Sequence, residues 1–241
     1  MKTVFPISLL LSLLVGTAIY AAAPIRILQM GDSITGQHEA RQFLYDRLSA
    51  DGVSFVFVGS QGWEPLWHEG YGGYTIGPDK SAPGNIYDHI EPWVTAARPD
   101  IITVLVGNND YNGKPGVDPA TAPARMEAFI KRLQAFAPKA TIIVASVLKI
   151  AWVDDYAGPL NRVLPDIVKR QQAQGHHVYF ADLATEVNLL KGDLPYDQPG
   201  GDYLDGTHLA TSGAHKLADG WYAHLKPFLK ASALAADTSR K

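Results

Sequence analysis

Apolar and polar positions along the chain follow two different periods. Five short runs are almost continuously apolar and rich in β-branched residues, which is typical of strands buried on both faces of a parallel sheet. These runs are Ile25–Met30, Val53–Val58, Ile101–Val106, Thr141–Val147 and His177–Ala181. Between and after them, apolar residues recur at the spacing of amphipathic helices. The predicted helices are Glu39–Leu48, Ile86–Ala97, Ala122–Phe136, Tyr156–Gln174 and Ser212–Leu229.

Strands that alternate with helices predict a three-layer α/β/α sandwich with right-handed crossovers. Pro92 falls inside a helical stretch, where it predicts a kink or a break. Two long segments, 59–83 and 184–207, lack a regular pattern and are rich in Gly, Pro and aromatic residues. Loops of this length in a compact domain usually carry function.

The start of the chain has the parts of a secretory signal peptide. Lys2 precedes an apolar run that ends at Ile19, and small residues follow at Ala21–Ala23. The run is shorter than the roughly 20 residues of a membrane span. A buried helix or an uncleaved anchor is the alternative. We expect a signal peptide over residues 1–22, an extracellular domain over 23–230 and a disordered tail over 231–241.

Composition narrows the function further. The formal charge is −3, and loss of Lys2 leaves 20 basic against 24 acidic residues, or −4. This balance gives no reason to expect nucleic acid as a partner, or a stable membrane association once residues 1–22 are removed. The chain has no cysteine, which excludes a disulfide and a thiol nucleophile. We expect a monomer without a cofactor or a metal.

The first candidate for chemistry is Ser33, in the turn Gly31-Asp32-Ser33 that follows the first strand. In open α/β folds, ligands bind at the carboxyl ends of such strands. The alternative is that Ser33 only caps the next helix. The G-x-S-x-G elbow of α/β-hydrolases is absent because position 35 is Thr.

The second candidate pair is Asp205 and His208, three residues apart and just before the last predicted helix. A serine hydroxyl needs a neighbouring base, and an imidazole fills this role best when a carboxylate fixes its tautomer. An Asp turn followed by a surface His is the alternative interpretation.

A third group of residues suits an oxyanion hole. Asn109 follows the third strand, and its amide is able to donate to a developing oxyanion. A backbone N–H of the glycine-rich segment 70–73 is the second candidate donor. Both segments are also compatible with ordinary turns.

The order Gly-Asp-Ser, Gly, Gly-x-Asn-Asp and Asp-x-x-His resembles the four sequence blocks of the SGNH (GDSL-type) hydrolase superfamily. The segment His68–Ile76 is similar to the corresponding loop of carbohydrate esterase family 3, which includes acetyl xylan esterases. The resemblance implies a flavodoxin-like sheet of five parallel strands in the order 2-1-3-4-5. It also implies a triad of Ser33, His208 and Asp205, and an oxyanion hole formed by Ser33, Gly73 and Asn109.

Four positions depart from this pattern. Gly72 stands where the family usually has Ser, and Asn108 stands where it usually has Thr. Leu209-Ala210 replaces the usual Pro-Asn after the histidine. The choice between Gly72 and Gly73 as oxyanion donor stays open.

The expected function is that of a secreted serine esterase that removes O-acetyl groups from polysaccharides. Asp32, Trp67, Tyr71 and Tyr74 are the predicted substrate contacts, although such aromatic residues also anchor long loops to a core. A lipase, lysophospholipase or thioesterase of the same superfamily is the first alternative, and a non-catalytic carbohydrate-binding protein is the second. The acidic segment with Asp193, Asp197, Asp202 and Asp205 lacks the ligand spacing of a calcium loop.

Overall fold

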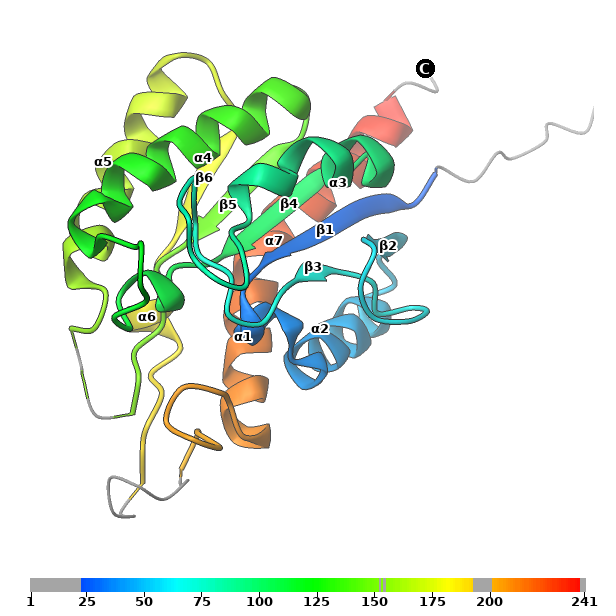
Figure 1. Cartoon of the computed structure of the whole chain (residues 1–241). Coiled ribbons are helices and arrows are strands. Elements are labelled where there is room, and N and C mark those ends of the chain that lie inside the picture. The colour runs from blue at the N-terminus through cyan, green and yellow to red at the C-terminus, as the bar shows by residue number, and fades with distance from the viewer. Residues whose placement is uncertain (1–22, 152, 154, 193–200, 239–241) are drawn as a thin grey trace, which may run out of the picture.

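A parallel sheet forms the centre of the protein (Figure 1). The computed structural model describes residues 23–151, 153, 155–192 and 201–238, with only the backbone for 230–238. The predicted signal peptide lies outside these residues. The main strands run in the order β2-β1-β4-β5-β6. Their bounds are β1 Ile25–Gly31, β2 Phe55–Val58, β4 Ile101–Leu105, β5 Thr141–Ala145 and β6 Val178–Ala181.

These five strands are the five that the apolar runs predict, and their order confirms the predicted 2-1-3-4-5 arrangement. A sixth strand, β3 (Glu69–Gly70), was not predicted, because two residues carry no periodic signal. It pairs with the last two residues of β1, where Met30 faces Glu69 and Gly31 faces Gly70. This pairing holds the segment after Gly59 against the carboxyl end of β1.

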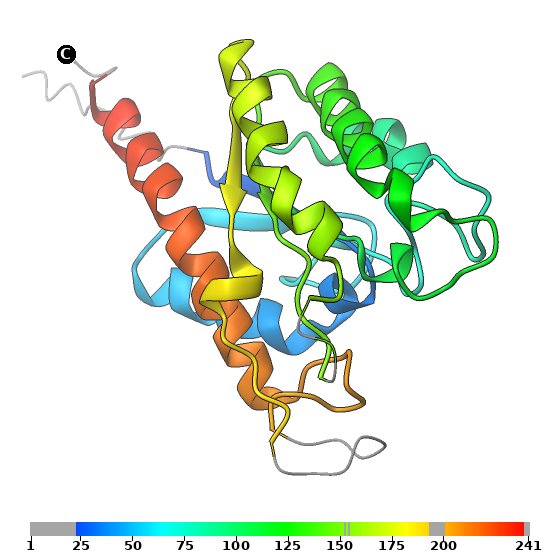
Figure 2. The same cartoon turned by 90° about the vertical axis from the view of Figure 1, so that its left-hand side faces the viewer.

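Helices cover both faces of the sheet, as Figures 1 and 2 show. One face carries α3 (Ile90–Ala97), α4 (Ala122–Phe136) and α5 (Gly158–Ala173). The other carries α2 (His38–Ala50), α7 (Thr211–Thr238) and the short α6 (Leu183–Glu186). Because α7 runs to Thr238, it extends past Leu229 and into the segment for which the sequence predicts a disordered tail.

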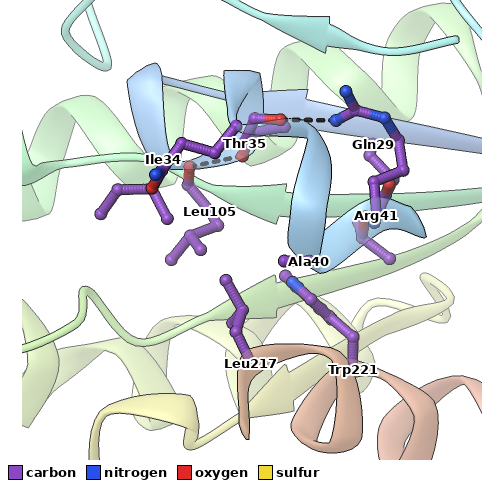
Figure 3. Close-up of a pocket in the computed structure, with 10 residues that line it drawn as sticks. Gln29, Ile34, Thr35, Ala40, Arg41, Leu105, Leu217 and Trp221 are labelled. Atoms are coloured by element: carbon purple, nitrogen blue, oxygen red, sulfur yellow. Dashed lines mark hydrogen bonds between the residues drawn. The ribbon is translucent and has the colours of Figure 1, made fainter. Parts of the chain in front are cut away.

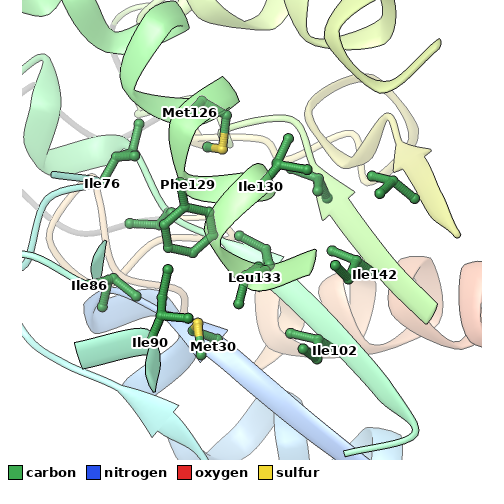
Figure 4. Close-up of a cluster of buried hydrophobic side chains, with 14 of the residues drawn as sticks. Met30, Ile76, Ile86, Ile90, Ile102, Met126, Phe129, Ile130, Leu133 and Ile142 are labelled. Atoms are coloured by element: carbon green, nitrogen blue, oxygen red, sulfur yellow. The ribbon is translucent and has the colours of Figure 1, made fainter. Parts of the chain in front are cut away.

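Two apolar cores lie between the sheet and these helix layers. On the α4 side, Phe129, Ile130 and Leu133 pack with Ile102 and Ile142 (Figure 4). On the α7 side the core includes Leu44, Leu48, Leu217, Trp221 and Leu225. The three- and four-residue spacings of these helix positions place them on one face. Alternate strand residues point to opposite cores, so Ile27 enters one and Leu28 the other.

Pro92 marks a break, as the sequence predicts. A 3₁₀ turn, η1 (Tyr87–His89), precedes α3, so that Pro92 lies in the first turn of that helix. A proline is tolerated there because the first-turn N–H groups have no partner inside the helix. In the described part of the chain, no helix combines the length and apolarity that a membrane span requires.

The carboxyl ends of the strands gather the irregular segments. Directly after β1 comes α1 (Ser33–Gly36), and the 3₁₀ turn η2 (Asn108–Asp110) follows β4 closely. A further 3₁₀ turn, η3 (Pro119–Thr121), leads into α4. This edge of a doubly wound sheet is where such folds bind ligands.

Candidate active site

The turn between β1 and α1 presents Ser33 at the edge of the sheet. A Cβ on Gly31 would collide with the carbonyl oxygen of Leu105 and the hydroxyl of Thr35, so only glycine fits before this turn. The Asp32 carboxylate accepts a hydrogen bond of 3.1 Å from the N–H of Ile34 and caps α1. Ser33 itself is half-buried.

Ser33, His208 and Asp205 form a continuous hydrogen-bonded line. His208 Nε2 lies 2.9 Å from Ser33 Oγ, and His208 Nδ1 lies 2.6 Å from Asp205 Oδ2. The other carboxylate oxygen, Oδ1, accepts from the backbone N–H groups of Thr207 (3.0 Å) and His208 (2.8 Å). Asp205 therefore shapes the loop that carries His208 and also contacts its ring.

The protonation of Asp205 suits this arrangement. Partial burial works to raise the pKa of Asp205, but hydrogen bonds from the His208 ring and from two backbone N–H groups outweigh it. The pKa therefore lies below its ordinary value. Asp205 is thus a carboxylate at neutral pH, which favours the imidazole tautomer with its proton on Nδ1 and leaves Nε2 free to accept the Ser33 proton.

Asn109 lies in η2, at the end of the neighbouring strand β4, with 9% of its surface exposed. Its Nδ2 donates to the Tyr74 carbonyl at 2.9 Å, and its Oδ1 accepts from Asn112 Nδ2 at 3.2 Å. A side-chain amide has two N–H groups, so one remains to donate to a substrate oxygen. The bond thus ties Asn109 to the residue that directly follows Gly73.

The structure separates the two candidate glycines. Gly73 has a φ of 78°, and a Cβ there would lie 3.0 Å from Pro83 Cδ, so this position requires glycine. Gly72 is exposed, and a Cβ there would meet no atom within 4 Å. A side chain fits at position 72, in keeping with the Ser that the resemblance places there.

A buried ion-pair network joins α4 to η2 and to the segment that follows Gly73. Arg125 of α4 contacts Asp110 Oδ1 and lies 3.1 Å from Asp79 Oδ2. Asp110 Oδ2 accepts from the Ile76 N–H at 3.1 Å. Burial raises the pKa of Asp110 to about 6 although Arg125 opposes the shift. Sequence reasoning missed Arg125, since an arginine on an amphipathic helix carries no sign of a buried partner.

Asp32 requires a correction to its predicted role as a substrate contact. It is 1% exposed, and its carboxylate is directed to backbone N–H groups. Burial raises the pKa of Asp32 to about 7. The residue therefore shapes the nucleophile turn and offers no surface to a substrate.

The predicted aromatic contacts do not all lie together. Tyr71 stacks on Tyr74, with ring centroids 5.0 Å apart, and also on Trp93 at 4.6 Å. His89 extends this stack beyond Trp93 at 4.8 Å. Trp67 is half-buried and donates to Glu64 at 2.8 Å. The sequence did not indicate Trp93 or His89, because they come from the separate segment η1–α3.

A cavity of about 20 Å³ lies behind the nucleophile turn (Figure 3). Arg41 spans this region by donating to the carbonyl oxygens of Thr35 (2.7 Å) and Leu66 (2.9 Å). Leu217 and Trp221 of α7 close the opposite side. The cavity holds one water molecule at most, so it is part of the scaffold and not a substrate site.

Within the described residues, no three His, Cys, Asp or Glu side chains converge as metal ligands would. Asp202 pairs with Lys216 at 2.6 Å, and Asp205 pairs with His208. Asp193 and Asp197 of the same acidic segment lie outside the described residues.

Fold and geometry together define a serine-histidine-aspartate arrangement on a flavodoxin-like sheet. The sequence profile of the GDSL-like Lipase/Acylhydrolase family matches residues 30–216. This chain belongs to that family, as the order of its sequence blocks predicts.

Individual relatives agree with this assignment. The Clostridium thermocellum family 3 carbohydrate esterase is 27% identical, with a TM-score of 0.65 over 87% of this chain and 99% of that one. A carbohydrate esterase family 3 structure from Talaromyces cellulolyticus shares the fold, with 23% identity and a TM-score of 0.68 over 86% of this chain and 99% of that one.

A curated relative from Acetivibrio thermocellus, "Putative endoglucanase X", is 29% identical over 160 residues. The match covers 64% of this chain and 62% of that protein, so the chain spans less than two thirds of this relative's length.

Proposed function

We propose that this protein is a secreted serine esterase that removes O-acetyl groups from polysaccharides through an acyl-enzyme. The observation that carries the proposal is the line from Ser33 Oγ through His208 to Asp205, with contacts of 2.9 and 2.6 Å. A hydroxyl, an imidazole and an orienting carboxylate in this order are what nucleophilic acyl transfer requires.

The proposed reaction has two halves. Ser33 Oγ attacks the ester carbonyl carbon while His208 Nε2 takes the hydroxyl proton, and Asp205 stabilises the imidazolium. The oxyanion accepts hydrogen bonds from the N–H groups of Ser33 and Gly73 and from the free amide N–H of Asn109. The tetrahedral intermediate then collapses, and His208 gives its proton to the departing alcohol oxygen.

In the second half, water attacks the acetyl-serine carbonyl while His208 takes a proton from it. Collapse of the second intermediate releases acetate and returns the proton to Ser33 Oγ. Every proton that leaves a nucleophile is thus delivered to a leaving oxygen, and the enzyme ends in its starting form.

The choice of an acetylated polysaccharide rests on two supports. The half-buried aromatic residues Tyr74, Tyr71 and Trp93 lie beside Gly73, and aromatic side chains near a catalytic edge suit contact with sugar rings. The second support is that two of the relatives above are named family 3 carbohydrate esterases. Export rests on the signal-peptide pattern of residues 1–22.

The test is acetate release from acetylated xylan, run beside p-nitrophenyl esters of acetate, butyrate and octanoate. The proposal predicts acetate release from the polysaccharide and turnover strongest on the acetate ester. A preference for octanoate would favour a lipid or thioester substrate instead. Binding to the polysaccharide without any hydrolysis would favour the non-catalytic alternative.

A further inference from the structure

Gln37 joins the segment of the proposed nucleophile to the segment of the proposed base. It lies between α1 and α2, four residues after Ser33, and is half-buried. Its Oε1 accepts from the N–H of Leu209 at 2.9 Å, and its Nε2 donates to the carbonyl of Leu209 at 3.1 Å. Leu209 directly follows His208. The single side chain of Gln37 therefore holds both the N–H and the carbonyl group of the residue next to the histidine.

We propose that Gln37 is a positioning residue that sets the separation of Ser33 Oγ and His208 Nε2. The proposal rests on the proposed esterase function. Two hydrogen bonds from one planar amide fix both the distance and the orientation of the bound backbone, which a single contact does not. Gln37 is also bonded to the nucleophile turn, because its own backbone N–H donates to the carbonyl of Ser33 at 3.0 Å.

The other backbone bonds of the His208 loop lie within the loop or join it to the segment after β5, where the Ala151 N–H donates to the Gly206 carbonyl at 2.8 Å. Asp205 accepts from the N–H groups of Thr207 and His208, and Leu204 N–H donates to the His208 carbonyl at 2.8 Å. These bonds shape the loop without joining it to α1. A second link between the start of α7 and α2 is exposed. In it, the Thr211 hydroxyl lies 3.3 Å from each carboxylate oxygen of Glu39.

The residue at position 209 makes this clamp, the pair of hydrogen bonds between the Gln37 side chain and the Leu209 backbone, possible. The family pattern that the chain resembles has proline after the histidine, and proline has no backbone N–H to donate. Here Leu209 supplies that N–H to Gln37, while its side chain is 2% exposed and packs in the α7-side core. The Gln37–Leu209 pair therefore provides a restraint that a proline at position 209 would supply only through its fixed φ.

The test compares Gln37→Leu, Gln37→Glu and Leu209→Pro in steady-state kinetics on p-nitrophenyl acetate. Loss of alignment between a nucleophile and its base by about 1 Å costs up to roughly 100-fold in rate. We expect Gln37→Leu to lower kcat by about 10- to 100-fold with little change in KM. Gln37→Glu retains an acceptor for the Leu209 N–H, so its kcat should lie between wild type and Gln37→Leu. Thr211→Val is the matched control for the exposed link, with kcat close to wild type.

A double-mutant cycle separates positioning from general loosening of the fold. Leu209→Pro removes the N–H that donates to Gln37 Oε1 and keeps only the carbonyl that accepts from Gln37 Nε2. Gln37→Leu should therefore cost less in the Leu209→Pro background than in wild type. Wild-type kcat in Gln37→Leu would overturn the proposal, as would a loss that only follows a fall in the folded fraction measured by circular dichroism. If Leu209→Pro does not fold, the ordering of wild type, Gln37→Glu and Gln37→Leu decides the question.

Ser33→Ala in the same assay distinguishes the two proposals. If Ser33→Ala is active, the proposed function itself fails. If Ser33→Ala is inactive while Gln37→Leu turns over normally, only the positioning role fails.

Discussion

His208 Nε2 lies 2.9 Å from Ser33 Oγ, although 175 residues separate the two along the chain. The contact exists because β1 ends at the nucleophile turn and the loop before α7 returns to the same edge of the sheet. Asp205 lies three residues before His208 and bonds both its ring and its backbone. The orientation of the imidazole is therefore set within a single short loop.

Asp205→Asn is predicted to lower kcat on p-nitrophenyl acetate by roughly 10³- to 10⁴-fold while KM changes little. The amide retains an acceptor for the N–H groups of Thr207 and His208, so the loop stays folded. The ring then loses its carboxylate partner and the tautomer that leaves Nε2 free. Asp202→Asn is the control in the same loop; its pairing with Lys216 supports the fold, so it should lower the Tm and leave kcat within a few-fold.

Asn109→Ala is predicted to lower kcat by roughly 10²- to 10³-fold, the usual cost of losing one oxyanion donor. Asn112→Ala removes only the bond that orients the Asn109 amide, and should cost less than tenfold. Steady-state kinetics on p-nitrophenyl acetate measures both. Equal effects of the two substitutions would argue against a direct role of the Asn109 amide.

Asp32 predicts a stability that falls as the pH rises. Burial raises its pKa from 3.8 to about 7, so between these values the folded chain holds a proton that the unfolded chain has released. Stability is therefore highest below about pH 4 for this group, and the loss is complete above about pH 7. The pKa of Asp110, raised to about 6, acts with the same sign.

Asp32→Asn should flatten this part of the pH dependence, because the amide still accepts from Ile34 N–H but does not ionise. Thermal unfolding across about pH 4 to 8 measures this pH dependence. Over that range the free energy of unfolding of the wild type should fall by on the order of 4 kcal/mol more than that of Asp32→Asn. The control is Asp118→Asn, an exposed N-cap of η3. If Asp32→Asn left the pH dependence of stability unchanged, the raised pKa of Asp32 would be refuted.

Arg125→Met is predicted to lower the free energy of unfolding by about 3–5 kcal/mol, since it leaves the buried Asp110 carboxylate without its cation. Adding Asp110→Asn should restore part of this loss. The exposed pair of Arg162 and Asp155 provides the comparison, and Arg162→Met should cost less than about 1 kcal/mol. Chemical denaturation of the wild type and of these three variants measures the free energy of unfolding of each.

The sequence predicted the sheet because its strands are buried on both faces and so read as continuous apolar runs. It also placed Ser33, Asn109, Asp205 and His208 at one edge, since each follows a strand or precedes a helix there. The network of Arg125, Asp110 and Asp79 was not predictable. It depends on which side of α4 faces a distant loop, and no local pattern records that.

The clamp between Gln37 and Leu209 escaped prediction for a related reason. A glutamine near a helix start is ordinary, and the replacement of Pro by Leu indicated only a change in the loop. Their partnership is visible only once α1 and the start of α7 are placed side by side. Asp32 was misjudged because its position in the motif says nothing about the depth at which its carboxylate lies.

The most direct test of the central claim is hydrolysis of p-nitrophenyl acetate by wild type and Ser33→Ala in parallel. We expect the wild type to turn over and kcat of Ser33→Ala to fall by several orders of magnitude while circular dichroism and Tm stay unchanged. Near-normal turnover by a folded Ser33→Ala variant would contradict the assignment of Ser33 as the nucleophile and, with it, the proposed mechanism.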